Sequence, residues 1–380
     1  MLQVGQQHWE CRVRRETPLV VGTATLLLFF VFGNAWLADP TQMAERGVLF
    51  VWLLAAIALC IFGVVRHADA LAELLGEPLG TLILTLAVIL IEISLIAAVM
   101  IEGVTDPTLA RDTMFAVIMI MMNGMVGLCL LSGGLLHVQQ EYNLEGARAY
   151  LAVLIPLSAI ALILPNRTVS TSLQGTLNFW QATLFSIATL VLYAIFLGLQ
   201  TMRHRGFFQE PDNGGAGESA DALSDADGQR QSIATHAVLL LLTMVPVVGL
   251  AEYLAVMIEQ GIHTFDVPTS VGGTLIAALI LAPESITAMK AALGNKLQRS
   301  INLCLGSALS TVALTVPLVL MIGLAIGQSV TLGLEDENIL LLALTLMVSV
   351  LTFGGTRTNV LHGAVHLLLF FTYVVLIFNP

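Results

Sequence analysis

Eleven stretches of the chain are each long and apolar enough to cross a lipid bilayer as a helix. A spanning helix needs about 17–25 predominantly apolar residues. Only 11% of the residues are charged, whereas soluble domains carry about 25%. The sequence therefore predicts an all-α polytopic membrane protein. The expected eleven transmembrane helices are residues 17–38, 47–65, 79–101, 112–136, 149–165, 178–200, 235–258, 269–289, 300–326, 338–354 and 359–378.

The distribution of Lys and Arg predicts how these spans are oriented. If the N-terminus is cytoplasmic, all 15 Lys and Arg residues except Arg46, Arg111 and Arg167 lie on the cytoplasmic side. Such an excess of positive charge is typical of cytoplasmic loops. The first apolar run is too long for a signal peptide, so we interpret it as a retained span. We therefore expect a multi-pass protein of the cell inner membrane, with its C-terminus outside.

One polar stretch divides the spans into a first six and a last five. Residues 206–232 are rich in Gly, Ser, Asp and Glu and cannot bury a core. The predicted organisation is an N-terminal segment with the first helix (1–45), a first five-helix repeat (46–205), this acidic cytoplasmic linker, and a second five-helix repeat (233–380). The linker could bind cations weakly or remain solvated and disordered. No basic run indicates nucleic acid as a partner, and the oligomeric state stays open.

The two halves contain similar segments. Residues 70–96 and 264–289 each have a glycine-containing turn, then Gly-Thr-Leu-Ile, then an apolar helix with one glutamate about eleven residues further on. In the predicted topology the two segments cross the membrane in opposite directions. This is the arrangement of inverted-topology transporters, whose sites lie near the membrane midplane where the repeats meet. The halves are therefore predicted to be inverted repeats.

The two glutamates, Glu92 and Glu284, are the strongest candidates for a functional site. A charged carboxylate at the membrane centre costs at least about 2.5–3.5 kcal/mol, and no Lys or Arg is predicted at that depth. Pro283 should bend or open the helix beside Glu284. Paired carboxylates in a low-dielectric site can hold a proton or a cation in competition, which is the basis of antiport. The structural alternative is a pair of protonated, hydrogen-bonded glutamates.

Hard cations take several oxygen ligands, so further polar groups are expected near the glutamates. Candidates for this supporting or pathway role are Thr81, Thr85, Asn123, Ser307, Ser310 and Thr311. Membrane hydroxyls also bond back to their own helix, which is the alternative for these residues. Glu73 and Glu77 could attract cations at the cytoplasmic mouth or simply be solvated. We expect His362 and His366 to serve packing or proton exchange, because no metalloprotease motif accompanies them.

Three segments resemble a known transporter family. GEPLGTLILTLAVILIEISLI (76–96), LILAPESITAMKAALGNKLQRSINLCLGSALSTVALTVP (279–317) and GGTRTNVLHGAVHLLLF (354–370) are similar to the calcium/cation antiporter superfamily, in its calcium/proton exchanger branch. The likeness is greatest to ChaA-type bacterial calcium–sodium/proton antiporters. The resemblance implies a secondary active cation/proton antiporter without a cofactor, with Glu92 and Glu284 as the cation- and proton-binding residues.

Several positions depart from the wider exchanger pattern. Ile89-Leu90-Ile91 and Leu281-Ala282-Pro283 replace Gly-Asn-Ala before the two glutamates, and Gln298 stands where Asp is usual. The resemblance therefore leaves Ca²⁺, Na⁺ and K⁺ open as the ion exchanged for H⁺. The alternatives are a passive cation channel, a non-transport membrane sensor and an intramembrane enzyme. The inverted repeat disfavours the first, the midplane glutamates disfavour the second, and no nucleophile–base pair supports the third.

Overall fold

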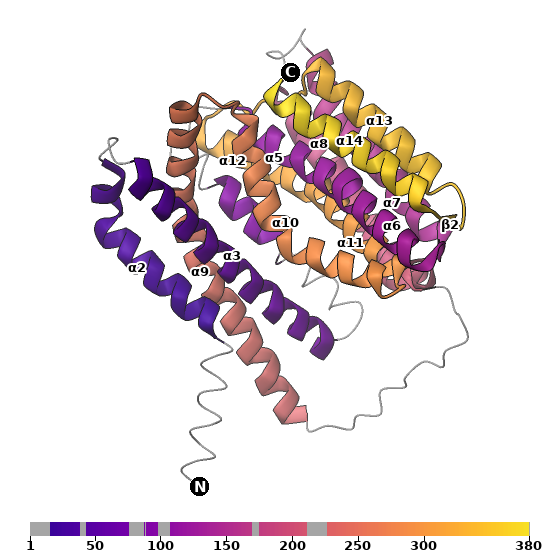
Figure 1. Ribbon diagram of the computed structural model, residues 1–380, viewed down its shortest axis with the longest axis horizontal. Coiled ribbons are helices and arrows are strands. Elements are labelled where there is room, and N and C mark those ends of the chain that lie inside the picture. Colours follow the sequence, from indigo (N-terminus) through magenta and orange to yellow (C-terminus); the bar gives the residue numbers. More distant parts are fainter. Residues whose placement is uncertain are drawn as a thin grey trace. The chain divides into compact units, whose positions relative to one another are not determined.

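The computed structural model describes residues 16–38, 43–75, 87, 89–97, 107–168, 175–210 and 226–379, and these are predominantly helical (Figure 1). The α-helices are α2 (Thr17–Ala38), α3 (Met43–Leu75), α5 (Leu109–Ile118), α6 (Val126–His137), α7 (Leu144–Ser158), α8 (Phe179–Gly198), α9 (Ala226–Phe265), α10 (Ser270–Leu293), α11 (Leu297–Ser310), α12 (Val316–Ile326), α13 (Asp336–Thr352) and α14 (Val360–Phe378). The π-helical turns are η1 (Met119–Met125), η2 (Ala159–Ile163), η4 (Leu199–Arg203) and η6 (Thr311–Thr315). The 3₁₀ turns are η3 (Leu164–Arg167) and η5 (Arg205–Phe208), and the strands are β1 (Gln140–Glu141) and β2 (Arg357–Thr358).

Eight helices within the described residues are long and apolar enough to cross a membrane. They are Glu45–Leu75, Leu109–His137, Leu144–Arg167, Phe179–Arg203, Ser232–Phe265, Ser270–Leu293, Leu297–Ile326 and Val360–Phe378. Each coincides with a predicted span, and the predicted all-α polytopic membrane fold is confirmed. Helices α2 and α13 match two further predicted spans. The full count of eleven stays a prediction.

Two helices are longer than their apolar runs predicted. Helix α3 continues through Leu75, beyond the predicted end at residue 65. Helix α9 begins at Ala226, so its first turns lie within the stretch that we expected to be linker. Hydropathy marks only the part of a helix that lipid or protein covers, and a helix can extend past it into polar surroundings.

The described chain forms two compact units that cut across the order of the predicted repeats. Unit 1 comprises Met1–Val104 and Asp221–Thr264, and unit 2 comprises Thr105–Ala220 and Phe265–Pro380. Unit 1 thus contains α2, α3, the helical segment 89–97 and most of α9. Unit 2 contains the remaining helices. Each half of the sequence therefore contributes helices to both units.

Small residues allow the helices of unit 1 to pack closely. A Cβ atom at Gly22 of α2 would lie 2.2 Å from Sγ of Cys60 on α3 and 3.1 Å from the ring of Pro246 on α9. A Cβ atom at Gly63 of α3 would lie 2.7 Å from the ring of Pro18. Glycines at helix contacts are typical of membrane proteins, because they let backbones approach where burial of apolar surface gives little advantage over lipid.

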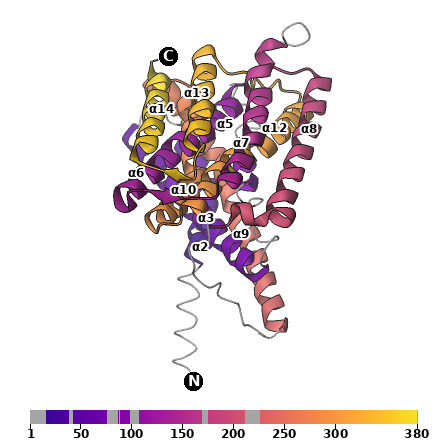
Figure 2. The ribbon, with the colours of Figure 1, turned by 90° about the vertical axis from the view of Figure 1, so that its right-hand side faces the viewer.

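In unit 2, α6 and α14 approach each other most closely through glycines on both helices. A Cβ atom at Gly363 of α14 would lie 2.5 Å from the backbone nitrogen of Leu131. Conversely, a Cβ atom at Gly127 of α6 would lie 2.9 Å from the backbone nitrogen of Leu367. Helix α13 lies beside α14, as Figures 1 and 2 show. The close backbone contact therefore ties the first half of the sequence to the last.

The loops at the two ends of unit 2 are paired in a way that supports an inverted repeat. At one end, here called the ribbon end, β1 after α6 pairs with β2 before α14. At the opposite end, the loop after α12 pairs with the loop before α8, where Leu332 and Gly333 donate backbone N–H groups to the oxygen of Gly175 at 2.8 and 2.9 Å. In the predicted repeat α12 corresponds to α6 and α8 to α14. The same loop pairing thus occurs once at each end.

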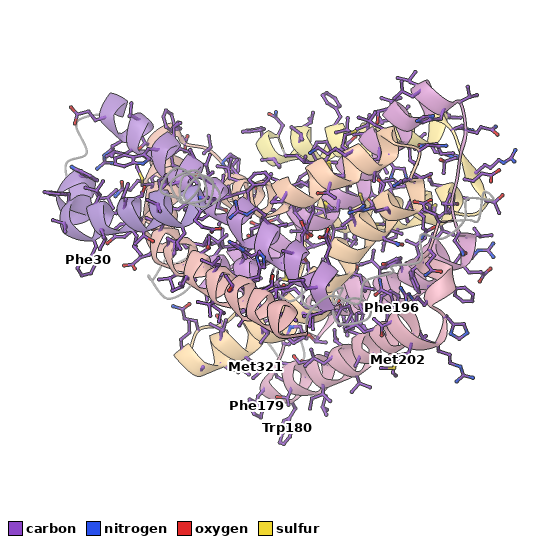
Figure 3. All side chains as sticks on the ribbon, turned by 90° about the horizontal axis from the view of Figure 1, so that it is seen from below. Phe30, Phe179, Trp180, Phe196, Met202 and Met321 are labelled. Atoms are coloured by element: carbon purple, nitrogen blue, oxygen red, sulfur yellow. The ribbon has the colours of Figure 1, made fainter. Side chains whose placement is uncertain are left out.

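The outward faces of the helices carry large apolar side chains. Phe30 in unit 1 and Phe179, Trp180, Met202 and Met321 in unit 2 are exposed and project from the helices in Figure 3. Extended exposed apolar surface is typical of protein that contacts a membrane. Phe196, also labelled there, is buried against Tyr150 and Phe208. The membrane-spanning fold therefore has lipid-facing surfaces and a separate packed interior.

Candidate functional site

Glu284 lies on α10, roughly 21 Å from the start of that helix at 1.5 Å per residue, and its side chain is half-buried. Pro283 precedes it within the helix, and the hydroxyl of Thr287 donates to the Pro283 oxygen at 2.9 Å. Helix α10 packs against α5, α6 and α11. The carboxylate interacts electrostatically with the Cys304 thiol of α11. Glu284 is therefore well inside a spanning helix of unit 2, as predicted.

Glu92 lies on the helical segment 89–97 of unit 1, and its side chain is only 2% exposed. Its helical neighbours Ile91, Leu95 and Ile96 are also buried and entirely apolar. The residue thus places a carboxylate away from water, where its charged form is costly. Both predicted glutamates are therefore withdrawn from the surface to different degrees.

Asn123 is completely buried within the π-helical turn η1 of unit 2. Its amide nitrogen contacts Oγ1 of Thr345 on α13 at 2.8 Å, and its amide oxygen lies 3.2 Å from Nδ1 of His366 on α14. The nitrogen also lies 3.4 Å from Sδ of Met119. The structure therefore brings Asn123 and His366, two residues singled out in the sequence, into one hydrogen-bonded group.

The hydroxyl candidates of the second half lie at the junction of α11 and η6. Ser310 is buried and donates to the Ser307 oxygen of its own helix at 3.1 Å, while Thr311 is buried in the first position of the π turn. Ser307 is half-buried. The π turns η1 and η6 occupy the corresponding helices of the two predicted repeats. Single π turns inside α-helices occur frequently at functional sites, because the wider turn redirects the side chains around it.

Three candidates of the first half, Thr81, Thr85 and Glu77, lie outside the described residues. Glu73 is exposed near the end of α3. Residues 70–75 form the last turns of that helix. The structure therefore places Glu73 at the polar end of a long helix.

A carboxylate-lined cavity of about 270 Å³ lies in unit 2, at the end opposite the ribbon end. Its lining includes Arg111, Asp112, Glu335, Glu337 and Tyr373. Nε of Arg111 donates to Oδ1 of Asp112 at 2.7 Å, and both side chains are buried. From the sequence, Arg111 was expected only to be a charge on the outside of the membrane. In the sequence, the one indication of this ion pair is that Arg111 and Asp112 are adjacent at the start of an apolar run.

A second polar group, which the sequence did not indicate, lies in unit 1. Oε2 of Glu16 accepts hydrogen bonds from Nη2 of Arg66 and Nε2 of His67 at 3.2 and 3.1 Å. Nδ1 of His67 lies 3.0 Å from Nδ1 of His236 on α9. These contacts join Glu16, just before α2, to side chains within α3 and α9. No group of three His, Cys, Asp or Glu side chains among the described residues is arranged to hold a metal ion.

Comparison with known proteins identifies the family. The model of the sodium/calcium exchanger protein family matches residues 46–202 and 235–379. The sodium-potassium/proton antiporter ChaA of Escherichia coli is 35% identical over 96% of this chain and 96% of its own. The putative ionic transporter y4hA of Sinorhizobium fredii is 38% identical over 88% of this chain and 90% of its own.

The fold also agrees with a solved structure. The crystal structure of the selenium-substituted Ca²⁺/H⁺ antiporter YfkE matches with a TM-score of 0.69 and 20% identity, covering 96% of this chain and 99% of that one. At this identity the match supports the fold alone. The family match leaves out 203–234, which includes the whole of the predicted linker. The resemblance expected from the three sequence segments is confirmed, and the chain belongs to the sodium/calcium exchanger protein family.

Proposed function

We propose that this protein is a secondary active antiporter that exports a cation, Na⁺, K⁺ or Ca²⁺, in exchange for H⁺. The observation that carries the proposal is Glu92, a carboxylate 2% exposed within an apolar helix of a membrane protein. Buried ionisable groups in membrane helices are costly and typically serve ion or proton movement. The full-length similarity to a sodium-potassium/proton antiporter supports the same function.

The proposed mechanism uses Glu92 and Glu284 as the groups for which proton and cation compete. Burial disfavours the charged form of a carboxylate, so each glutamate is stable when protonated. A cation beside the carboxylate supplies positive charge and favours loss of the proton. Binding of one therefore releases the other, and movement of the site between the two sides of the membrane gives obligatory exchange. Ser307, Ser310 and Thr311 are the proposed supporting oxygen groups of the second half.

Each glutamate lies on a helix of a different predicted repeat, which suits a transporter with inverted symmetry. We further propose that the chain lies in the cell inner membrane with a cytoplasmic N-terminus, an outside C-terminus and a cytoplasmic linker. A reporter fused after Pro380 should be active outside the cytoplasm, and one inserted in 211–225 should be active inside. If both reporters are active on the same side, the inverted orientation of the halves is wrong.

The function is tested with purified protein in liposomes that contain a pH-sensitive dye. Na⁺, K⁺ and Ca²⁺ are added separately in the presence of an imposed proton gradient, and the dye reports the proton movement after each addition. If the protein is an antiporter, the cation should drive proton movement even when the membrane potential is held at zero by a method that does not use K⁺. Cation flux without proton movement would indicate a channel instead. Movement of neither would leave a sensor as the better account.

A further inference from the structure

A continuous chain of buried polar side chains joins three helices of unit 2. His366 on α14 lies between Asn123 of η1 and Thr352, the last residue of α13, and all three are at most 2% exposed. Nδ1 of His366 is 3.2 Å from the Asn123 oxygen, and Nε2 is 3.0 Å from Oγ1 of Thr352. Thr345 completes the chain at 2.8 Å from the Asn123 nitrogen. Each polar atom on this path therefore has a specific neighbour.

The hydrogen-bond pattern determines which ring nitrogen of His366 carries the proton. The hydroxyl of Thr345 donates to the Leu341 oxygen at 2.8 Å, so its oxygen accepts from the Asn123 amide nitrogen. The Asn123 oxygen then faces His366, and because an amide oxygen can only accept, Nδ1 must donate to it. In the neutral ring Nε2 accepts, and Thr352 donates to it. This chain of hydrogen bonds thus requires that His366 be a neutral imidazole with its proton on Nδ1.

A shift of the backbone at Asn123 would be transmitted to α10, the helix that carries Glu284. On one side of η1, α5 contacts α10 so closely that a Cβ atom at Gly273 would lie 2.7 Å from the backbone nitrogen of Thr113. On the other side, Oγ of Ser132 on α6 contacts Sδ of Met289 on α10 at 3.3 Å. A π turn changes the angular register of the residues on either side of it. The register held at Asn123 therefore determines how both segments meet α10.

We propose that His366 is a positioning residue for ion exchange, which donates its Nδ1 proton to Asn123 and thereby holds the π turn against the helix of Glu284. The inference rests on the proposed function, because the helix that it positions carries the proposed ion-binding glutamate. In this conformation Asn123 connects η1 to α13 and α14 through hydrogen bonds. Thr345 and Thr352 orient the two ends of the chain.

The atoms of the side chain provide a direct test. The amide nitrogen of asparagine can occupy the place of Nδ1, whereas that of glutamine can occupy the place of Nε2. His366→Asn should therefore preserve the bond to Asn123, and His366→Gln should lose it and leave a buried acceptor unsatisfied. An unsatisfied buried group costs about 1–3 kcal/mol, so we expect His366→Gln to raise the KM for the cation at least roughly fivefold with a smaller change in maximal rate. His366→Asn should stay within about twofold of the wild type.

His263→Gln is the control, because it makes the same replacement at an exposed histidine of α9, and its KM should not change. All variants are compared in the liposome assay after a check that they elute as single species from size exclusion. In an Asn123→Ala background, His366→Gln should add no further rise in KM, since the shared interaction is already lost. A wild-type protein without coupled exchange would contradict the proposed function. Coupled exchange in the wild type, with equal KM values for His366→Asn and His366→Gln, would overturn the positioning role alone.

A spectroscopic measurement tests the tautomer independently of transport. Protein with ¹⁵N-labelled histidine, reconstituted in lipid, should give a signal of an Nδ1-protonated neutral ring that disappears in His366→Asn. Persistence of that signal in the variant, or its absence from the wild type, would contradict the assigned tautomer. The result does not depend on which cation is transported.

Discussion

The contact between α6 and α14 predicts that Gly363→Ala destabilises the protein. The new Cβ atom would lie 2.5 Å from the backbone nitrogen of Leu131, 2.8 Å from the oxygen of Gly127 and 2.9 Å from Cα of Leu131. All three neighbours are backbone atoms, so no side-chain rotation can relieve the overlap. The two helices would have to separate by roughly 1 Å along this contact, at a point where small residues let them pack.

The cost of this change can be separated from the intrinsic helix preference of alanine. Overpacking of a well-packed contact typically costs about 1–3 kcal/mol. Alanine within a helix is favoured over glycine by about 1 kcal/mol, which partly offsets the overlap. Gly198→Ala on α8 is a suitable control, because nothing lies within 4 Å of a Cβ atom there. The difference in stability between the two variants therefore reports the overlap alone.

The measurement is thermal unfolding of both variants in the same detergent, with the loss of the monodisperse peak as the signal. At roughly 2 °C per kcal/mol, the value for a large domain, Gly363→Ala should unfold roughly 2–6 °C below Gly198→Ala. Unfolding of membrane proteins is often irreversible, so both variants are heated at the same rate. Equal midpoints for the two variants would refute the close backbone contact between α6 and α14.

Two further predictions concern polar groups at the ribbon end of unit 2. Glu210 accepts a hydrogen bond from the backbone nitrogen of Arg299 at 3.1 Å, and partial burial raises the pKa of its carboxyl group above the ordinary value. The form in which Glu210 contacts Arg299 therefore binds the proton more tightly, so this contact should weaken as pH rises from the ordinary pKa of the carboxyl group to the raised one. Glu210→Gln should remove this pH dependence from the hydrogen exchange of residues 205–208. The same pH dependence in the variant would exclude Glu210 as its source. Arg357→Ala should change stability by less than about 1 kcal/mol in the same thermal assay, because the Arg357–Glu141 ion pair is exposed, and a larger loss would show that the pair fixes the β1–β2 ribbon.

Hydropathy predicted most of the helices because the length of a spanning helix is set by the thickness of the membrane. It did not predict that α3 extends to Leu75 or that α9 starts at Ala226, since polar residues at the ends of a helix carry no such signal. The positions of Glu92 and Glu284 within their apolar helices were also readable from spacing alone. The approximate repeat then indicated that the two residues belong together in function.

The π turns and the long-range polar contacts could not be predicted in this way. Residues Met119–Met125 are apolar apart from Asn123 and a glycine, a composition that also suits a regular α-helix. His366 contacts Asn123 across 243 positions of sequence, and Arg111 donates to the Gly333 oxygen across 222. Such partners are determined by how α5, α13 and α14 pack, for which a single sequence holds no direct signal.

The central claim is that Glu92 and Glu284 each bind both the cation and the proton. The most direct test is cation-driven proton movement in liposomes that contain Glu92→Gln or Glu284→Gln, across pH 6 to 9. Glutamine keeps the size of the side chain but carries no charge and no exchangeable acid proton, so each variant should insert normally and lose coupled exchange. Glu73→Gln is the control, because this exposed residue should affect at most the apparent affinity. Near-normal coupled exchange in either Glu92→Gln or Glu284→Gln would contradict the claim for that glutamate.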